Sequence, residues 1–202
     1  MKPYKYILPI LLITSLSSTA QEIRFSAGYN GSNIKETGTD KWAGRAGYQF
    51  GADVLLGNRV FVKPGINFMV RNLNYSFADT TGITPTEFKY TSRYLSVPIM
   101  LGVNFLDPTD DPPINAYVMA GPTALFNLSA DLNNNNLDVQ TSSSQWYVGF
   151  GAGLEFSFLF LEAGYDVALT KEFDEFNRPN LTTNPKVNYL HIVGGVRLRL
   201  AK

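Results

Sequence analysis

The stretch SQWYVGFGAGLEFSF, residues Ser144–Phe158, carries an apolar side chain at every second position from Trp146 to Phe158. The positions between them hold tyrosine, glycine, glutamate and serine. A β-strand points alternate side chains to opposite faces, so this strand has one large apolar face and one small, polar face. The apolar face points inward in a water-soluble barrel and outward, into lipid, in a membrane barrel. Its direction therefore decides both fold and function.

Seven further stretches alternate in the same way, which predicts an all-β chain of eight strands. The seven are Glu22–Ser32, Arg45–Leu56, Val60–Arg71, Phe88–Leu106, Asn115–Leu128, Phe160–Lys171 and Val187–Leu200. Pro64, Pro98 and Pro122 fall inside these stretches, and proline cannot donate a ladder hydrogen bond. We therefore expect β-bulges at the three prolines.

The segments between the strands alternate in length, which favours an up-and-down meander. The short ones are Gly57–Asn58, Asp107–Ile114 and Ser157–Leu159; the long ones are Asn33–Gly44, Asn72–Glu87, Ser129–Ser143 and Glu172–Lys186. Outer-membrane barrels have short periplasmic turns and longer outer loops. We therefore expect both ends of the barrel chain and the short turns at one end, and four surface loops at the other.

The two faces of the strands differ in a way that favours a membrane barrel over a soluble barrel. The apolar face carries almost no charge, and aromatic residues lie near both of its ends, as in interfacial girdles. These aromatic residues are Tyr29, Tyr48, Trp146, Phe156, Phe158 and Tyr165. A lipocalin-type soluble barrel fits the alternation equally well and stays the alternative. We predict an eight-stranded antiparallel transmembrane β-barrel whose apolar rows face lipid.

The N-terminus has the pattern of a cleaved signal peptide. Lys2 and Lys5 precede the apolar run Tyr6–Ile13, and small residues at Ser18 and Ala20 fit cleavage after Ala20. The run is too short for a membrane span of about 20 residues. We therefore expect a signal peptide at residues 1–20 and a single barrel domain at residues 21–202.

The amino-acid composition excludes several classes of function. Loss of Lys2 and Lys5 leaves 15 basic against 17 acidic residues, so the expected mature chain has a net charge of −2 and no basic excess for nucleic acid. The chain contains no cysteine, which excludes disulfides and thiolate chemistry. No later segment approaches 18 consecutive apolar residues, so the sequence predicts no transmembrane helix.

Several segments resemble the PorT-like outer-membrane β-barrel family of Bacteroidetes. They are RYLSVPIMLG (Arg93–Gly102), GADVLLGNRVFVKPGINF (Gly51–Phe68), the pair Ala20–Gln21 and the strand GGVRLRL (Gly194–Leu200). The resemblance spans nearly the whole mature chain. It implies an eight-stranded barrel in the outer membrane of a Gram-negative bacterium, with outer-membrane lipid around it. It does not carry over the secretion role of PorT itself.

Catalytic and metal-binding patterns are weak. The only histidine, His191, lies on the inward-facing side of the last strand, and no G-x-S-x-G nucleophile motif occurs. GFGAG (Gly149–Gly153) lies within a strand with no helix after it, so it does not fit a nucleotide-binding loop. The acidic residues of the connecting segments lack EF-hand spacing. We therefore expect no enzyme activity, no cofactor and no metal.

Charged residues on the inward-facing side predict an ion-pair network in the lumen. They are Arg24, Asp53, Lys63, Glu155, Glu162, Asp166, Arg197 and Arg199. Buried charges survive only when they are paired. From strand neighbourhood we expect Glu162 to pair with Arg197 or Arg199, and Asp53 with Arg24 or Lys63, while Asp166 extends the network.

The sequence leaves two functions open, depending on whether the lumen is plugged or holds a continuous cavity. A plugged lumen predicts a structural or interaction barrel, acting as a monomer, that displays its outer loops to a protein or surface partner. A continuous cavity lined by Phe61, Tyr117 and Met119 would instead favour a narrow passage or carrier for a small ligand, an apolar one included. Eight strands leave a lumen only about as wide as the side chains that fill it, so bulk solute flow is not expected.

Overall fold

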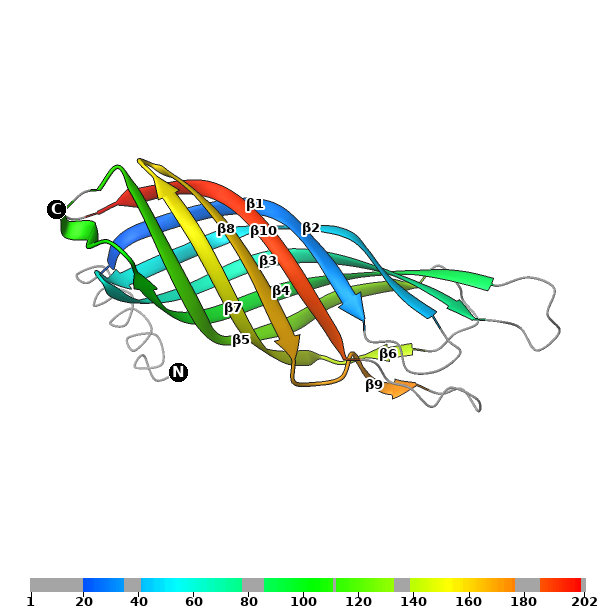
Figure 1. Ribbon diagram of the computed structural model, residues 1–202. Helices are drawn as coiled ribbons and strands as arrows, with labels where there is room; N and C mark the ends of the chain where they lie inside the picture. Colours follow the sequence, from blue (N-terminus) through cyan, green and yellow to red (C-terminus); the bar gives the residue numbers. More distant parts are fainter. Residues whose placement is uncertain are drawn as a thin grey trace, which may run out of the picture.

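The computed structural model describes residues 20–34, 41–77, 86–110, 112–132, 139–176 and 186–200 (Figure 1). Eight strands close into one barrel in the order β1-β10-β8-β7-β5-β4-β3-β2, so the predicted eight-stranded barrel is confirmed. The strands are β1 Ala20–Ile34, β2 Lys41–Gly57, β3 Val60–Phe77, β4 Thr86–Asn104, β5 Ile114–Leu132, β7 Ser144–Phe156, β8 Leu159–Ala168 and β10 Val187–Arg199.

Every neighbouring pair of barrel strands is antiparallel, including the pair β1–β10 that closes the barrel. The first strand pairs with the last from Glu22–Arg199 to Ile34–Val187, so the ladder has no open edge. Closure satisfies the backbone N–H and C=O groups within the sheet, which a strand in lipid requires. The up-and-down connectivity follows, because each strand pairs with the strand before and after it in the meander.

The short connections gather at one end of the barrel, which also holds the start of β1 and the end of β10 (Figure 1). A hydrogen bond of 2.8 Å from Asn104 N to Arg59 O joins the end of β4 to the β2–β3 turn there, and one of 2.8 Å from Phe105 N to Ala116 O joins the two sides of the β4–β5 connection. Gly57 takes a φ of 110° in the tight turn between β2 and β3, a backbone region that favours glycine. We call this the short-turn end.

Two small elements were not expected. Strands β6 (Val139–Thr141) and β9 (Phe173–Phe176) pair as a separate two-stranded sheet, and the 3-10 helix η1 spans Pro108–Asp110. No helix in the described ranges has the length and apolarity needed to cross a membrane. The centres of the predicted long loops, at Thr39, Thr81, Asn134 and Asn177, lie outside the described residues.

The apolar rows of the strands face outward, which answers the question raised by Ser144–Phe158. In β7, Phe150 is 53% exposed and Leu154 is 56% exposed, whereas the intervening Glu155 is 2% exposed. The burial pattern of β8 alternates along most of the strand, and Leu161 faces outward. A soluble barrel would bury these residues, so the inward-apolar alternative is wrong.

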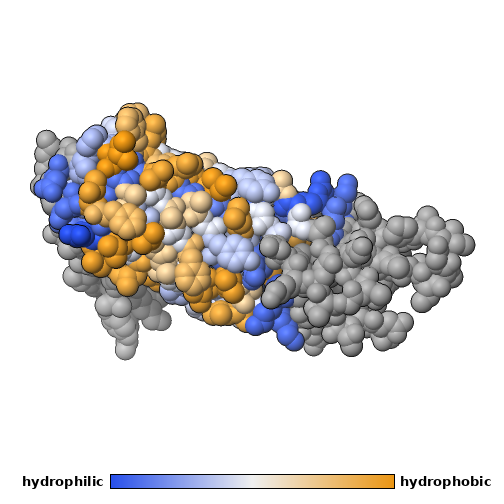
Figure 2. Space-filling view, viewed as in Figure 1, coloured by the Kyte–Doolittle hydropathy of each residue, from blue (hydrophilic) through white to orange (hydrophobic). Residues whose placement is uncertain are grey.

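Aromatic side chains ring the outer wall near both of its ends. Tyr29, Tyr48 and Trp146 are exposed toward the long-connection end, and Phe156 and Phe158 toward the short-turn end. Figure 2 shows apolar residues over the visible wall, with hydrophilic residues gathered at its two ends. This is the arrangement of a membrane barrel, in which an apolar band lies between two interfacial girdles.

The prolines do not produce the expected bulges. The pairings Pro64–Ile99 and Asn67–Ser96 keep one register, and so do Pro98–Thr123 and Leu101–Ala120. The ladder omits two residue pairs in each case and resumes without a shift. The missing proline N–H is therefore accommodated by a gap in the pairing. The register shifts of the barrel lie elsewhere, after Ala20, Arg45 and Arg93.

The strands of the barrel differ in length around its circumference. Strands β3, β4 and β5 have 18, 19 and 19 residues, whereas β7, β8 and β10 have 13, 10 and 13. Because all strands begin or end at the common short-turn end, the longer strands extend farther at the opposite end (Figure 1).

The outward apolar rows generate a test of the lipid-facing wall. Ile192, near the centre of β10 and 45% exposed, should tolerate arginine poorly. An outward arginine at the bilayer midplane costs about 2–4 kcal/mol, so Ile192→Arg should lower the free energy of unfolding by that amount. Leu198→Arg, on the same face close to the short-turn end, should cost only about 0–1 kcal/mol. Urea unfolding in lipid vesicles measures both, and equal costs would contradict the outward placement.

Candidate functional site in the lumen

Four charged side chains, which we call the lower cluster, cross the lumen near the short-turn end. They are Glu22 and Arg24 of β1, Glu155 of β7 and Arg197 of β10. Arg197 Nη1 lies 2.6 Å from Glu155 Oε2 and 3.2 Å from Glu22 Oε2. Arg24 pairs with the other oxygen of each carboxylate, at 2.5 Å to Glu22 Oε1 and through Nη2 to Glu155 Oε1. The four side chains form a neutral ring of alternating charges.

The lower cluster is removed from solvent. Exposure is 5% for Glu22, 1% for Arg24, 2% for Glu155 and 5% for Arg197. The Arg24 guanidinium also lies 5.1 Å from the ring centre of Tyr117 and 5.3 Å from that of Phe160. Because β8 lies between β7 and β10, the ring joins strands that are not neighbours in the barrel. It therefore fills part of the lumen at this level with paired, buried side chains.

The ion-pair partner of Glu162 and the position of Arg199 both differ from the prediction. Glu162 pairs with Lys63 at 2.6 Å and accepts a 2.8 Å hydrogen bond from the Tyr117 hydroxyl, so its expected pairing with Arg197 or Arg199 is wrong. Glu162 stands opposite Val193, and Arg197 lies four residues farther along β10, roughly 13 Å at the usual rise per residue. Arg199 is 32% exposed at the rim and 3.9 Å from Glu22.

Asp53 and Arg24 are direct cross-strand partners, yet they do not form the expected ion pair within 4.0 Å in the described part of the chain. Arg24 turns instead toward Glu22 and Glu155, where it meets two carboxylates. Asp53 is 6% exposed and faces the middle of the lumen. Lys63, the other expected partner of Asp53, is committed to Glu162.

A second group of buried polar side chains, the upper cluster, lies toward the opposite end of the lumen. Its members are Arg71, Tyr94, Gln145, Tyr147 and Glu172. Arg71 is fully buried, with Nη1 3.5 Å from Glu172 Oε2 and 3.2 Å from the Tyr147 hydroxyl. The Tyr94 hydroxyl donates to Glu172 Oε1 at 2.7 Å, and its ring lies 5.5 Å below the Arg71 guanidinium. Like the lower cluster, the upper one balances its charges.

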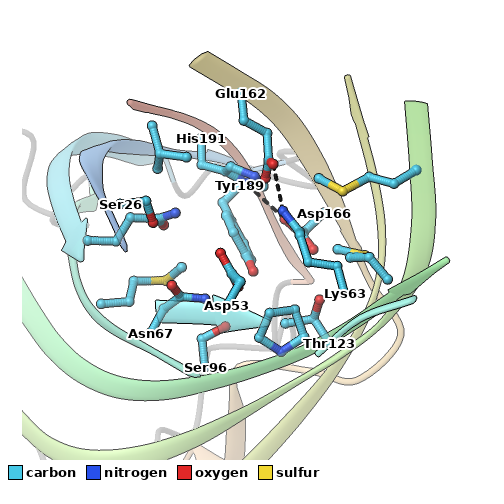
Figure 3. A pocket seen from close by; sticks show the side chains of 16 residues that line it. Ser26, Asp53, Lys63, Asn67, Ser96, Thr123, Glu162, Asp166, Tyr189 and His191 are labelled. Carbon is cyan, nitrogen blue, oxygen red and sulfur yellow. Dashed lines mark hydrogen bonds and ion pairs between the residues drawn. The ribbon is translucent and has the colours of Figure 1, made fainter. Parts of the chain in front are cut away.

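Between the two clusters lies a central cavity of about 40 Å³ (Figure 3). A buried water needs about 10–15 Å³ by the same measure, so the cavity has room for a few water molecules. Its lining includes Asp53, Lys63, Glu162, Asp166 and His191. Three carboxyl groups there face one ammonium group, so acidic side chains outnumber basic ones on the lining of the cavity.

His191 and Asp166 form a pair on the wall of the central cavity. His191 Nδ1 lies 3.1 Å from Asp166 Oδ2 (Figure 3). Asp166 was expected to extend the network of ion pairs, and its partner is this histidine. Ser26 and Ser96 also line the cavity.

Several lumen residues were missed in the sequence. Glu22 continues the inward parity of Arg24, so two-residue spacing alone could have found it. Arg71 also lies at an inward-facing alternate position of its strand. Its partner Glu172, however, lies beyond the end of β8, in a segment whose sequence predicts a loop. No group of three or more histidine, cysteine, aspartate or glutamate side chains is close enough to hold a metal in the part of the chain described.

The lower cluster generates a prediction on stability. Glu155→Gln removes one carboxylate from between two buried guanidiniums, and breaking a buried pair on one side costs about 3–5 kcal/mol. The free energy of unfolding in vesicles should fall by that amount. Arg199→Gln, at the exposed rim, should change it by no more than about 1 kcal/mol. A loss for Glu155→Gln no larger than that for Arg199→Gln would show that the ring contributes little to stability.

Solved structures share this architecture. The outer membrane protein OprG from Pseudomonas aeruginosa matches 90% of this chain and 97% of its own, with 13% identity and a TM-score of 0.54. Ail, the attachment invasion locus protein of Yersinia pestis, solved with the heparin analogue sucrose octasulfate, covers 89% of this chain and 99% of its own, with 18% identity and a TM-score of 0.47. At these identities the likeness concerns the fold alone.

Sequence comparison gives the family. A search among curated proteins finds no match. The sequence profile of the outer membrane protein beta-barrel domain matches residues 17–174, which is more than half of the chain. This match agrees with the closed barrel, its outward apolar wall and its polar lumen. The chain is an outer-membrane protein and belongs to the outer membrane protein beta-barrel domain family.

Proposed function

We propose that this protein is a non-conducting outer-membrane barrel that acts as a structural or interaction element. The observation that carries the proposal is the pair of neutral, buried clusters that cross the lumen at two levels. An eight-stranded barrel leaves only about enough interior for side chains, and here those side chains are fixed by charge-assisted hydrogen bonds. Solute would have to break both clusters to pass.

The passage or carrier alternative receives less support. Of the three residues that would line an apolar route, Phe61 and Tyr117 pack edge to face at a centroid distance of 5.8 Å and are each 1% exposed. Only Met119 lines the central cavity. The apolar side chains therefore fill the lumen at this level, which is why we favour the closed barrel.

Other parts of the proposal rest on the sequence. The cleaved signal peptide at residues 1–20, the PorT-like branch of the family, the monomeric state and the absence of catalysis stay predictions. We propose that the long segments between strands meet a protein or surface partner, because a closed barrel has only its outer end to offer to the exterior. The short-turn end would then face the periplasm.

The orientation in the membrane can be tested with single cysteines, because the chain has none of its own. Asn134→Cys, in a long connection, should react with a membrane-impermeant maleimide on intact cells. Asn58→Cys, in the tight turn after β2, should react only after the outer membrane is permeabilised. Immunoblots of the labelled protein read out both variants, and the reverse pattern would invert the topology.

The closed lumen can be tested by removing charge-balanced pairs. The lower variant carries Glu155→Ala with Arg197→Ala, and the upper variant carries Arg71→Ala with Glu172→Ala. Because the two closures act in series, wild type and each variant should be nearly silent in planar-bilayer recordings. The combination of all four substitutions should give steady conductance.

The outcome depends on the folded state of each variant, which heat-modifiable mobility on gels reports independently. Conductance from only the combined, folded variant supports two closures in series. Large, steady conductance from the wild-type protein would overturn the closed barrel and promote the passage alternative. Conductance from either single variant would show that the other cluster does not seal the lumen.

A further inference from the structure

All the soft ligand groups of the mature chain line one cavity. Of the four methionines, the three after Met1 are Met69, Met100 and Met119, and each lines the central cavity together with the single histidine, His191. Thioether sulfur and imidazole nitrogen are ligands that suit Cu(I). Methionine is also a common filler of irregular cavities, so the geometry has to decide between the two roles.

The glycines of β7 and β8 form a floor on which these side chains meet. A Cβ atom added to Gly151 would lie 2.7 Å from Met119 Cε, and one added to Gly149 would lie 2.6 Å from Met100 Cε. A Cβ added to Gly164 would lie 2.4 Å from His191 Nε2. The tips of three long side chains from β4, β5 and β10 thus occupy the space that these glycines leave open.

The floor is compact. Gly151 and Gly164 are direct cross-strand partners, whose inward positions are about 4.5–5.5 Å apart, and Gly149 is the next inward residue of the same strand. Met100 and Met119 also belong to one cluster of buried residues in contact. Met69 belongs to a different cluster, with Tyr94, Leu125, Tyr147, Ala168 and Tyr189. Met100, Met119 and His191 therefore form the core of the arrangement, and Met69 lies at its edge.

The partner of His191 prepares the ring for a ligand role. Asp166 Oδ2 lies 3.1 Å from Nδ1, which places a carboxyl group beside the ring, while Nε2 lies next to the glycine floor. Histidines that bind metals usually donate their other ring N–H to a carboxylate in this way. Asp166 is 1% exposed, so the orientation is fixed inside the barrel.

The charge of the cavity also suits a cation. Asp53, Glu162 and Asp166 face only Lys63 as a permanent positive charge on the lining. Uncompensated buried negative charge is costly, and a monovalent cation would reduce it. The acidic and basic groups balance within the lower cluster and within the upper cluster. The excess of acidic over basic side chains therefore lies on the lining of the cavity between them.

We propose that the central cavity is a Cu(I) site in which Met100, Met119 and His191 supply the ligands and Asp166 positions the histidine. The site requires both methionine sulfur atoms to turn toward Nε2, and the three rotatable bonds of each methionine side chain permit such a change. The site goes beyond the closed barrel proposed above and does not depend on whether the lumen conducts. The sequence conceals it, because its ligands are 19 and 72 positions apart along the chain.

The test uses the full protein purified from outer membranes, with Ag⁺ as a redox-stable probe for a soft monovalent ion. Calorimetric titration should show one Ag⁺ per chain. In spectra of the methyl-labelled methionines, the Met100 and Met119 signals should move, and the Met69 signal should move much less. Cu⁺ generated anaerobically with ascorbate, in competition with a chelator, should give the same stoichiometry.

Substitutions can distinguish side chains that bind the metal ion from side chains that only fill the cavity. Met100→Leu with Met119→Leu conserves volume and keeps the fold, and it should weaken Ag⁺ binding by about 100-fold or more. Met69→Leu is the matched control, since it removes a thioether from the same lumen, and it should leave the affinity within about threefold. Asp166→Asn should weaken binding by about 10–100-fold through the orientation of His191.

Several outcomes would overturn the site. These are the absence of saturable one-to-one binding, unchanged affinity in the double leucine variant, or equal weakening by Met69→Leu. Displacement of bound Ag⁺ by Na⁺ or Ca²⁺ would assign the cavity to hard cations held by its carboxylates. None of these results bears on conductance, so the closed barrel and the Cu(I) site can fail separately.

Discussion

Closure of an eight-stranded ladder inside lipid is the constraint on which the rest of this molecule depends. It fixes the apolar rows outward and leaves an interior too narrow for bulk water. Every inward polar group must then find its partner across the barrel or beside it. The ring of Glu22, Arg24, Glu155 and Arg197 meets that demand, because each carboxylate oxygen in it contacts a guanidinium.

The lumen is organised in levels along its axis. Ion pairs cross it near the short-turn end, and a second group, Arg71 with Glu172 and two tyrosines, crosses it higher up. The level between them keeps a small cavity with unequal charge, where His191 and Asp166 pair. Glycines bound the middle level on one side, and the tips of Met100, Met119 and His191 occupy the space beside them.

Two-residue periodicity predicted most of the fold and little of the pairing. It placed Phe150 outward and Glu155 inward, and the alternation of short and long connections predicted the meander. It did not predict that Glu162 would meet Lys63, because the partners sit on strands that are distant in the sequence and staggered by the tilt of the barrel. Glu172 was missed for a different reason, since it lies past the last ladder residue of β8, where periodicity ends. Met100, Met119 and His191, the soft ligand groups of the cavity, do not recur at a regular interval in the sequence.

The unequal strand lengths have a consequence for how the barrel meets its surroundings. A wall of 18 or 19 residues on β3, β4 and β5 stands beside a wall of 10 or 13 residues on β7, β8 and β10. A barrel of even height would look the same from every direction in the plane of the bilayer. In this barrel the described strands reach unequal heights at the long-connection end, so the rim is uneven around the membrane normal.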